Sequence, residues 1–149
     1  MSEMSEVWTP VPIVPYNIKY LVSNMGRVKS KDRKVNYREK VSKKISKRIY
    51  PGKILNPATS SEGYKFVSLR IDGRVKQIYV HRLVAMAFVD EYDDGLVVNH
   101  KNENKADNRY TNLEWCTQKY NANYGTRNER MRNSLVNVWR AKNGNKIEQ

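Results

Sequence analysis

Residues 97–125 constrain the fold of this chain more than any other stretch, because strand, loop and helix signals follow one another within it. An apolar Val-Val pair predicts a short strand that ends at Asn99 and His100. A polar loop follows over residues 101–110, and residues 113–115 predict a second strand with its apolar side chains on one face. We therefore expect two antiparallel strands joined by a polar loop.

A helix is predicted directly after this hairpin. Thr117 is a good N-cap, residues 118–124 favour a helix, and Gly125 is placed to end it. Asn121 lies one turn into this helix, where its side chain can face the hairpin. The stretch therefore predicts a strand-strand-helix unit.

The residues upstream predict a platform of small hairpins and one helix. Residues 1–18 contain three prolines, which favour an extended segment at a sheet edge. Residues 20–30 predict a small hairpin, and residues 64–70 lead through an Asp-Gly turn into a partner strand at 75–80. Residues 81–89 have apolar side chains at helical spacing, so a helix is expected to pack on the second hairpin.

Charge is strongly segregated along the chain, which has a formal net charge of +13. Residues 27–53 hold twelve Lys and Arg against two acids, and residues 126–149 hold six against two. Residues 81–125 hold five against seven. Two basic flanks around a slightly acidic centre indicate a nucleic-acid partner, because a polyanion relieves the repulsion within each flank. A membrane partner is not expected, since the chain has no long apolar run.

Two segments leave alternatives open. We interpret residues 31–53 as a flexible basic loop, either ordered on nucleic acid or solvated without contacts. Residues 128–141 predict a helix that either docks on the body or tracks along nucleic acid.

The single cysteine, Cys116, limits which metal the chain can hold. It cannot form an internal disulfide or a cysteine-based zinc site, so no structural zinc is expected. Any metal must then bind to oxygen and imidazole ligands, which suit Mg²⁺ or Mn²⁺ better than structural zinc. The first residues lack a basic and an apolar region of the kind a secretion signal needs, so a cytoplasmic location is expected.

Hydrolysis of a phosphodiester needs a base for water and a cation for the phosphate charge. His100 suits the base, because an unperturbed histidine titrates near neutral pH. Asn112 could position its ring, and the side-chain oxygens of Asn99 and Asn121 could ligate a hard cation. A structural interpretation stays open for the other polar groups. His81 is expected to be structural, and the remaining loop residues are expected to form turns: Asn102, Asn104, Asp107 and Asn108.

Three linked segments resemble one family. VVNHKNENKADNRYTNLEWCTQKYNANYG, at 97–125, resembles the His-Asn-Asn form of the HNH nuclease motif in phage intron-encoded and free-standing HNH homing endonucleases. YVHRLVAMAFV, at 79–89, is similar to the lead-in helix of that family. Trp8, Ile13 and YLVSNMGRVKS, at 20–30, resemble the N-terminal module that accompanies these nucleases. The resemblance covers about residues 8–125, in family order.

The resemblance implies a ββα-metal (His-Me finger) core that hydrolyses DNA with one Mg²⁺ or Mn²⁺. His100 falls on the general-base position, Asn112 on the residue that orients that histidine and braces the core, and Asn121 on a metal ligand. Asn99 falls where some members carry an aspartate ligand, and this is the main departure from the pattern. An amide keeps the oxygen and loses the negative charge, so we expect either a weaker affinity for the cation or a greater dependence on DNA phosphates as its ligands.

We therefore expect an α+β chain in three parts. Residues 1–57 form an N-terminal β-hairpin module that includes the flexible basic loop. Residues 58–125 form the HNH nuclease domain, and residues 126–149 form a basic C-terminal helix. Double-stranded DNA is the expected partner of a chain that acts as a monomer in a bacterial cell, encoded by a phage or prophage.

The basic residues expected to hold DNA lie in the hairpins, the loops and the C-terminal helix: Arg27, Lys29, Lys31, Arg33, Lys34, Lys43, Lys44, Lys47, Arg48, Lys65, Arg70, Arg74, Lys76, Arg82, Lys101, Lys105, Arg127 and Arg130. Two other functions stay open. One is a non-catalytic DNA-binding protein that keeps the HNH fold as a scaffold, and the other is an RNA-binding protein.

Overall fold

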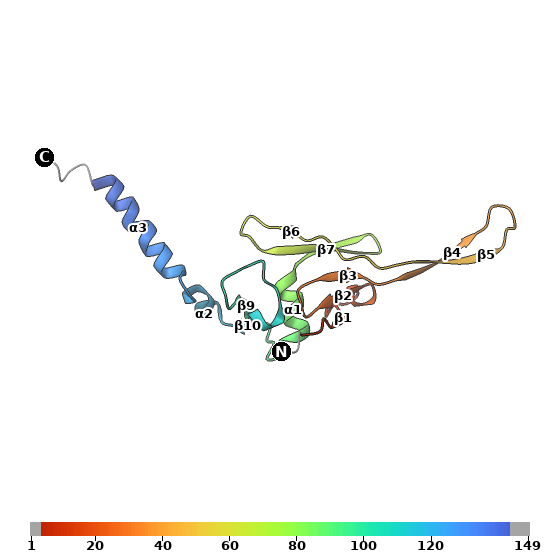
Figure 1. Cartoon of the computed structure of the whole chain (residues 1–149), viewed down its shortest axis with the longest axis horizontal. Helices are drawn as coiled ribbons and strands as arrows, with labels where there is room; N and C mark the ends of the chain where they lie inside the picture. Colours follow the sequence, from red (N-terminus) through yellow and green to blue (C-terminus); the bar gives the residue numbers. More distant parts are fainter. Residues whose placement is uncertain (1–3, 144–149) are drawn as a thin grey trace.

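The structure is a computed structural model that describes residues 4–143. Four small antiparallel sheets and three α-helices make up an elongated molecule (Figure 1), in which a two-stranded ribbon and a long helix project from opposite ends of a central body. The expected α+β class is confirmed. No helix within this part of the chain combines the length and apolar character needed to cross a membrane.

The N-terminal sheet has the order β1-β2-β3, with β1 at Trp8–Pro10, β2 at Tyr20–Ser23 and β3 at Val28–Ser30. The proline-rich start therefore lies on a sheet edge, as predicted, because an edge strand has one row of unpaired backbone groups. The hairpin predicted at 20–30 is confirmed by the antiparallel pairing of Val22 with Val28.

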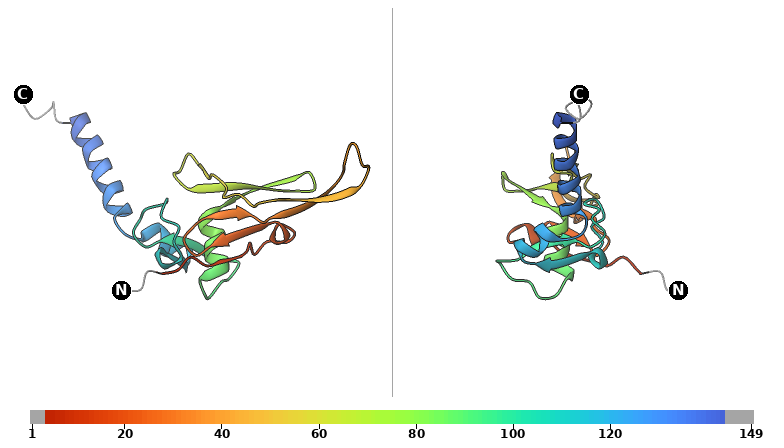
Figure 2. Two further views of the ribbon diagram at one scale, coloured as in Figure 1. Left: turned by 45° about the vertical axis from the view of Figure 1, so that its right-hand side comes forward. Right: turned by 90° about the vertical axis from the view of Figure 1, so that its left-hand side faces the viewer.

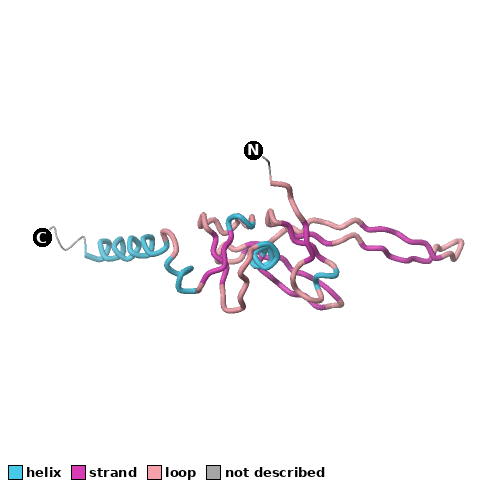
Figure 3. The backbone as a smooth tube through the Cα atoms, turned by 90° about the horizontal axis from the view of Figure 1, so that it is seen from below, coloured by secondary structure: helices cyan, strands magenta, loops and turns pink. Residues whose placement is uncertain are grey.

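The prediction of a flexible loop at residues 31–53 is wrong. This segment forms a regular ribbon, with β4 at Arg33–Arg38 paired along its whole length to β5 at Ile45–Tyr50. The ribbon extends beyond the body (Figures 1 and 3), and all but one of its strand residues are exposed. Because neither face is buried, apolar and polar residues alternate only briefly, at Val35 and Tyr37, and not along both strands as in a half-buried hairpin.

The second hairpin carries the first helix. Strands β6 at Ala58–Thr59, β7 at Lys65–Ile71 and β8 at Arg74–Tyr79 form one sheet. The predicted Asp-Gly turn joins β7 to β8 with positive φ at both residues, as a type I′ turn requires. Helix α1, Val80–Phe88, follows without a loop and confirms the predicted helix.

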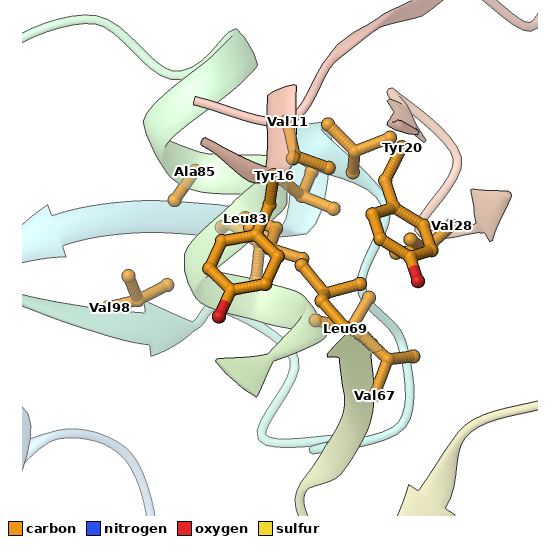
Figure 4. Close-up of a cluster of buried hydrophobic side chains, with 13 residues drawn as sticks. Val11, Tyr16, Tyr20, Val28, Val67, Leu69, Leu83, Ala85 and Val98 are labelled. Atoms are coloured by element: carbon orange, nitrogen blue, oxygen red, sulfur yellow. The ribbon is translucent and has the colours of Figure 1, made fainter. Parts of the chain in front are cut away.

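One hydrophobic core holds these elements together (Figure 4). The almost fully buried residues are Val11 directly after β1, Val22 from β2, Leu69 from β7, Leu83 from α1 and Leu113 from the last hairpin. Tyr20 adds a polar link, because its hydroxyl accepts from the backbone N–H of Arg70 and donates to its carbonyl. The N-terminal sheet and the elements after it are therefore packed as one unit.

The strand-strand-helix unit is also present. Strand β9, Val97–His100, pairs with β10, Leu113–Cys116, and α2 follows at Gln118–Asn123. The Thr117 hydroxyl accepts from the N–H of Tyr120, which confirms the predicted N-cap. A short 3-10 helix, Tyr110–Asn112, directly precedes β10.

Helix α3, Arg127–Asn143, extends from α2 away from the body (Figure 2). Its Arg127 donates to the carbonyl of Ala122 and its Arg130 forms an ion pair with Glu103. The rest of the helix projects outward, so of the two alternatives the helix is an arm rather than a docked element. The last residues of the predicted C-terminal part, 144–149, lie outside the described residues, as do residues 1–3.

Candidate nuclease site

A cleft of about 570 Å³ lies between the β9–β10 hairpin, α2 and the start of α3. Asn99, His100 and Asn121 all line it, so the structure brings together three of the predicted site residues. Tyr64 from the second sheet and Lys105 from the polar loop also line this cleft. The cleft therefore offers an imidazole, the side-chain amides of Asn99 and Asn121, and positive charge to one ligand, and its lining also includes Gln118 and the carboxylate of Glu103.

His100 is held in a single orientation. The ring is 5% exposed, and its Nε2 lies 2.8 Å from Oδ1 of Asn108. An amide oxygen only accepts, so Nε2 carries the proton and donates to Asn108. Nδ1 is then the nitrogen that can accept a proton, which is the form that a general base requires.

The pKa of His100 is lowered from the ordinary histidine value, mainly because burial disfavours the charged ring. The hydrogen bond to Asn108 and the nearby Asp107 carboxylate oppose this effect, while Lys105 adds to it. The imidazole is therefore neutral at neutral pH and ready to accept a proton.

His81 packs against this ring without sharing its role. The two imidazoles meet edge to face with centroids 5.2 Å apart, and His81 stacks on Tyr79. Burial, with smaller effects from His100 and Arg82, lowers the pKa of His81 to about 3. Its buried Nδ1 has no hydrogen-bond partner within residues 4–143. The expected structural role agrees with this environment, because His81 is an uncharged side chain that packs against the His100 ring.

The roles of two asparagines differ from those that the sequence predicted, although Asn112 keeps a bracing role. Asn112, expected to orient His100, does not bond to the ring. Its side chain instead accepts from the N–H of Asn102 and donates to the Asn102 side chain and to the carbonyl of Asp107, so it braces the polar loop. Asn108, expected to form a turn, is 5% exposed and is the ring's partner.

The position of Asn108 depends on the N-terminal sheet. Gly26 has φ +88°, and a Cβ at this position would lie 2.9 Å from the Asn108 Cβ. The N–H of Tyr110 donates to the carbonyl of Asn24 at 2.9 Å. The spacing of residues in the sequence could not reveal that Asn108 binds His100, because the position of Asn108 depends on its contact with the distant Gly26. The only local sign of this close contact was Gly26, in the turn of the hairpin predicted at residues 20–30.

Asn99 and Asn121 present amide oxygens suited to a hard cation. Nδ2 of Asn99 donates to Oε1 of Glu114 at 2.7 Å, which leaves the Asn99 oxygen as the free end of this amide. The side chain of Asn121 makes no hydrogen bond to another described residue. The described chain also holds no cluster of three His, Cys, Asp or Glu side chains for a metal. The donors thus fit a divalent cation that takes the rest of its ligands from water and phosphate.

The basic residues expected to hold DNA fall into two groups. Those on the ribbon are exposed, and two arginines stack on ribbon tyrosines: Arg33 on Tyr50 and Arg48 on Tyr37. Several others already have partners within the protein. These are Arg27 with Glu6, Lys31 with the Asn17 carbonyl, Lys65 with the Thr59 hydroxyl, Lys105 with the Glu62 carbonyl, Arg127 with the Ala122 carbonyl, and Arg130 with Glu103.

The sequence matches two known families at these elements. Residues 78–123, which span α1, the β9–β10 hairpin and α2, match the HNH endonuclease family. Residues 6–70 match the NUMOD4 motif. The chain belongs to the HNH endonuclease family, and the expected resemblance is confirmed.

Particular relatives are also similar. DNA endonuclease I-HmuI of Bacillus phage SP01 is 38% identical over 133 residues, which are 89% of this chain and 63% of that protein. An uncharacterized HNH endonuclease, L245 of Acanthamoeba polyphaga mimivirus, is 38% identical over 105 residues, 70% of this chain and 26% of that protein.

A solved structure that describes DNA binding and cleavage by the HNH homing endonuclease I-HmuI matches with a TM-score of 0.60 and 34% identity. The match covers 95% of this chain and 67% of that one. Of the two curated relatives, I-HmuI and L245, the chain spans less than two thirds of the length.

Proposed function

We propose that this chain is a metal-dependent endonuclease that hydrolyses phosphodiester bonds in double-stranded DNA. The observation that carries the proposal is the geometry of His100, a neutral imidazole with Nε2 committed to Asn108, in a cleft that also contains Asn99 and Asn121. The similarity to I-HmuI, a relative described as a DNA endonuclease, supports the same reaction.

In the proposed mechanism, Nδ1 of His100 takes the proton of the attacking water. The hydrogen bond to Asn108 keeps the ring from rotating, and Asn112 keeps the polar loop that carries Asn108 in place. Asn99 and Asn121 would hold one Mg²⁺ or Mn²⁺, which when bound stabilises negative charge on the phosphate and the leaving oxygen. Lys105, which lines the cleft, adds positive charge beside the phosphate.

The shape of the molecule suits a long duplex. The ribbon and α3 project from opposite ends of the body (Figure 1), and both carry exposed Lys and Arg side chains. The lining of the cleft includes Arg127 and Arg130 at the start of α3. Such side chains bind phosphates largely without regard to sequence. We propose that these two elements hold the flanks of the site while the cleft receives one strand.

The test is cleavage of supercoiled plasmid by purified protein with Mg²⁺, with Mn²⁺, and with EDTA. We expect nicking or linearisation only with a divalent ion, and none by His100→Ala. Asn104→Ala is a matched control, because this loop residue only caps a turn through the N–H of Ala106. Undiminished cutting by His100→Ala would refute the assignment of the base.

The alternative is a non-catalytic DNA-binding protein, and the uncharged Asn99 is the observation that favours it. That function predicts tight, salt-dependent binding of duplex DNA with no products under any metal. Gel-shift and cleavage assays on the same preparation distinguish the two functions.

A further inference from the structure

Asn99 and Glu114 face each other across the β9–β10 hairpin. They are direct cross-strand partners, and Nδ2 of Asn99 donates to Oε1 of Glu114 at 2.7 Å. Asn99 is 5% exposed, and Glu114 is half-buried. A charge-assisted hydrogen bond of this length is stronger than one between neutral groups, so it fixes the orientation of the amide.

We propose that Glu114 is a positioning residue of the metal site, and that it supplies the negative charge that Asn99 lacks. Rotating the Asn99 amide by half a turn would place two oxygens against each other, so Glu114 keeps the nitrogen on its own side and the oxygen free for a cation. The inference rests on the proposed function, because it concerns the same cation.

Besides the Asn99 amide, the Glu114 carboxylate interacts with the hydroxyl of Tyr120, and neither partner carries a positive charge. The ion pairs formed among residues 4–143 do not include it, although the chain holds 28 Lys and Arg. A half-buried carboxylate without a positive partner is unfavourable, and a cation on the far side of the Asn99 amide removes that disadvantage. The carboxylate also polarises the amide through the hydrogen bond, which makes its oxygen a better ligand.

The test compares Mn²⁺ affinity, measured by electron paramagnetic resonance on the full chain in the presence and absence of duplex DNA, among four proteins. Glu114→Gln keeps the shape and removes the charge, and we expect Mn²⁺ to bind about 10-fold more weakly, within the range found when partners of metal ligands are lost. Glu129→Gln removes the same charge from the exposed first turn of α3 and should bind like the wild type.

The fourth protein exchanges the two groups. Asn99→Asp combined with Glu114→Gln keeps one negative charge and one hydrogen bond in the pair, with the charge now on the ligand. We expect this double variant to regain at least the wild-type Mn²⁺ affinity, with thermal unfolding midpoints close to that of the wild type. A structural role for Glu114 predicts no such rescue of metal binding.

Different results reject different parts of the proposal. Wild-type affinity in Glu114→Gln, or a double variant as weak as Glu114→Gln, overturns the role of Glu114 and leaves the nuclease assignment standing. A wild-type protein that binds no Mn²⁺, even with duplex DNA, rejects the metal site itself and this inference with it.

Discussion

Oδ1 of Asn108 lies 2.8 Å from Nε2 of His100, so one nitrogen of this buried imidazole is committed and the other is free to act. Removing the amide with Asn108→Ala should lower the cleavage rate by roughly 10- to 100-fold, less than the loss of a general base, which contributes about 10² to 10⁴. Single-turnover cleavage under saturating Mg²⁺ measures the effect. Asn102→Ala is the control for general loosening of the loop, and an equal loss there would argue against a specific role of Asn108.

The pH dependence of cleavage should report on His100. Burial lowers its pKa below the ordinary 6.5, and the neutral ring is the active form, so the rate should stay constant from neutral pH down past 6.5 before it falls. Asn108→Asp places a carboxylate beside Nε2–H, stabilises the charged ring and raises the pKa of His100. The acidic limb of the profile should therefore move to higher pH in this variant. An unchanged limb would show that another group controls it.

The buried His81 should make stability depend on pH. Its pKa is about 3 in the folded protein and near 6.5 when unfolded, so between these values the unfolded chain binds more protons. Stability is therefore lost as pH falls below 6.5, and by pH 5 the loss should be about 2 kcal/mol. Urea unfolding at pH 7 and pH 5 measures it. In His81→Phe the loss between pH 7 and pH 5 should shrink to the smaller part that His100 contributes, because burial also lowers the pKa of that ring. An undiminished loss would assign it to groups other than His81.

The exposed ribbon should increase DNA affinity without stabilising the protein against unfolding. Replacing Lys43, Lys44, Lys47 and Arg48 by Gln should reduce the slope of log affinity against log salt by about 0.9 for each phosphate that the ribbon no longer neutralises. The urea midpoint should not change. A matched variant that exchanges Lys and Arg at the same positions keeps the charges and should keep the slope. Equal slopes in all three proteins would show that the ribbon does not bind DNA.

Replacing Gly26 should reduce cleavage activity as well as stability, because the residue lies against Asn108. Gly26→Ala introduces strain at φ +88° of about 1–2 kcal/mol and also forces a Cβ to 2.9 Å from that of Asn108. Gly73→Ala is the matched control, because it has φ +74° with nothing within 4 Å of its Cβ. We expect both variants to lose stability in urea unfolding, and only Gly26→Ala to lose most of its cleavage activity. Equal activity in the two would show that the close approach to Asn108 is not needed.

Local signals were sufficient to predict the strand-strand-helix unit and the hairpin before α1. Thr117, the Asp-Gly turn and the alternation in β7 act through neighbouring residues, so a sequence pattern reveals them. The ribbon was missed because its strands bury neither face, and strand prediction depends on a buried face.

The polar network of the site was harder to predict for a different reason. Asn108 and Asn112 are the same residue type four positions apart, and only the fold of the loop decides which one reaches His100. Likewise, the sequence showed an uncharged Asn99 where an aspartate was expected. Its charged partner, Glu114, lies on the opposite strand, 15 positions further along the chain.

The single core has a consequence for how such chains can be recombined. The NUMOD4 and HNH segments are recognised separately in sequence, yet Val11 and Val22 of one pack in the same cluster as Leu83 and Leu113 of the other. The two segments are therefore expected to unfold in one cooperative transition rather than as independent units. An HNH segment joined to a foreign N-terminal segment would need the matching apolar surface, and above all the turn at Gly26, to keep the loop that carries Asn108 in position.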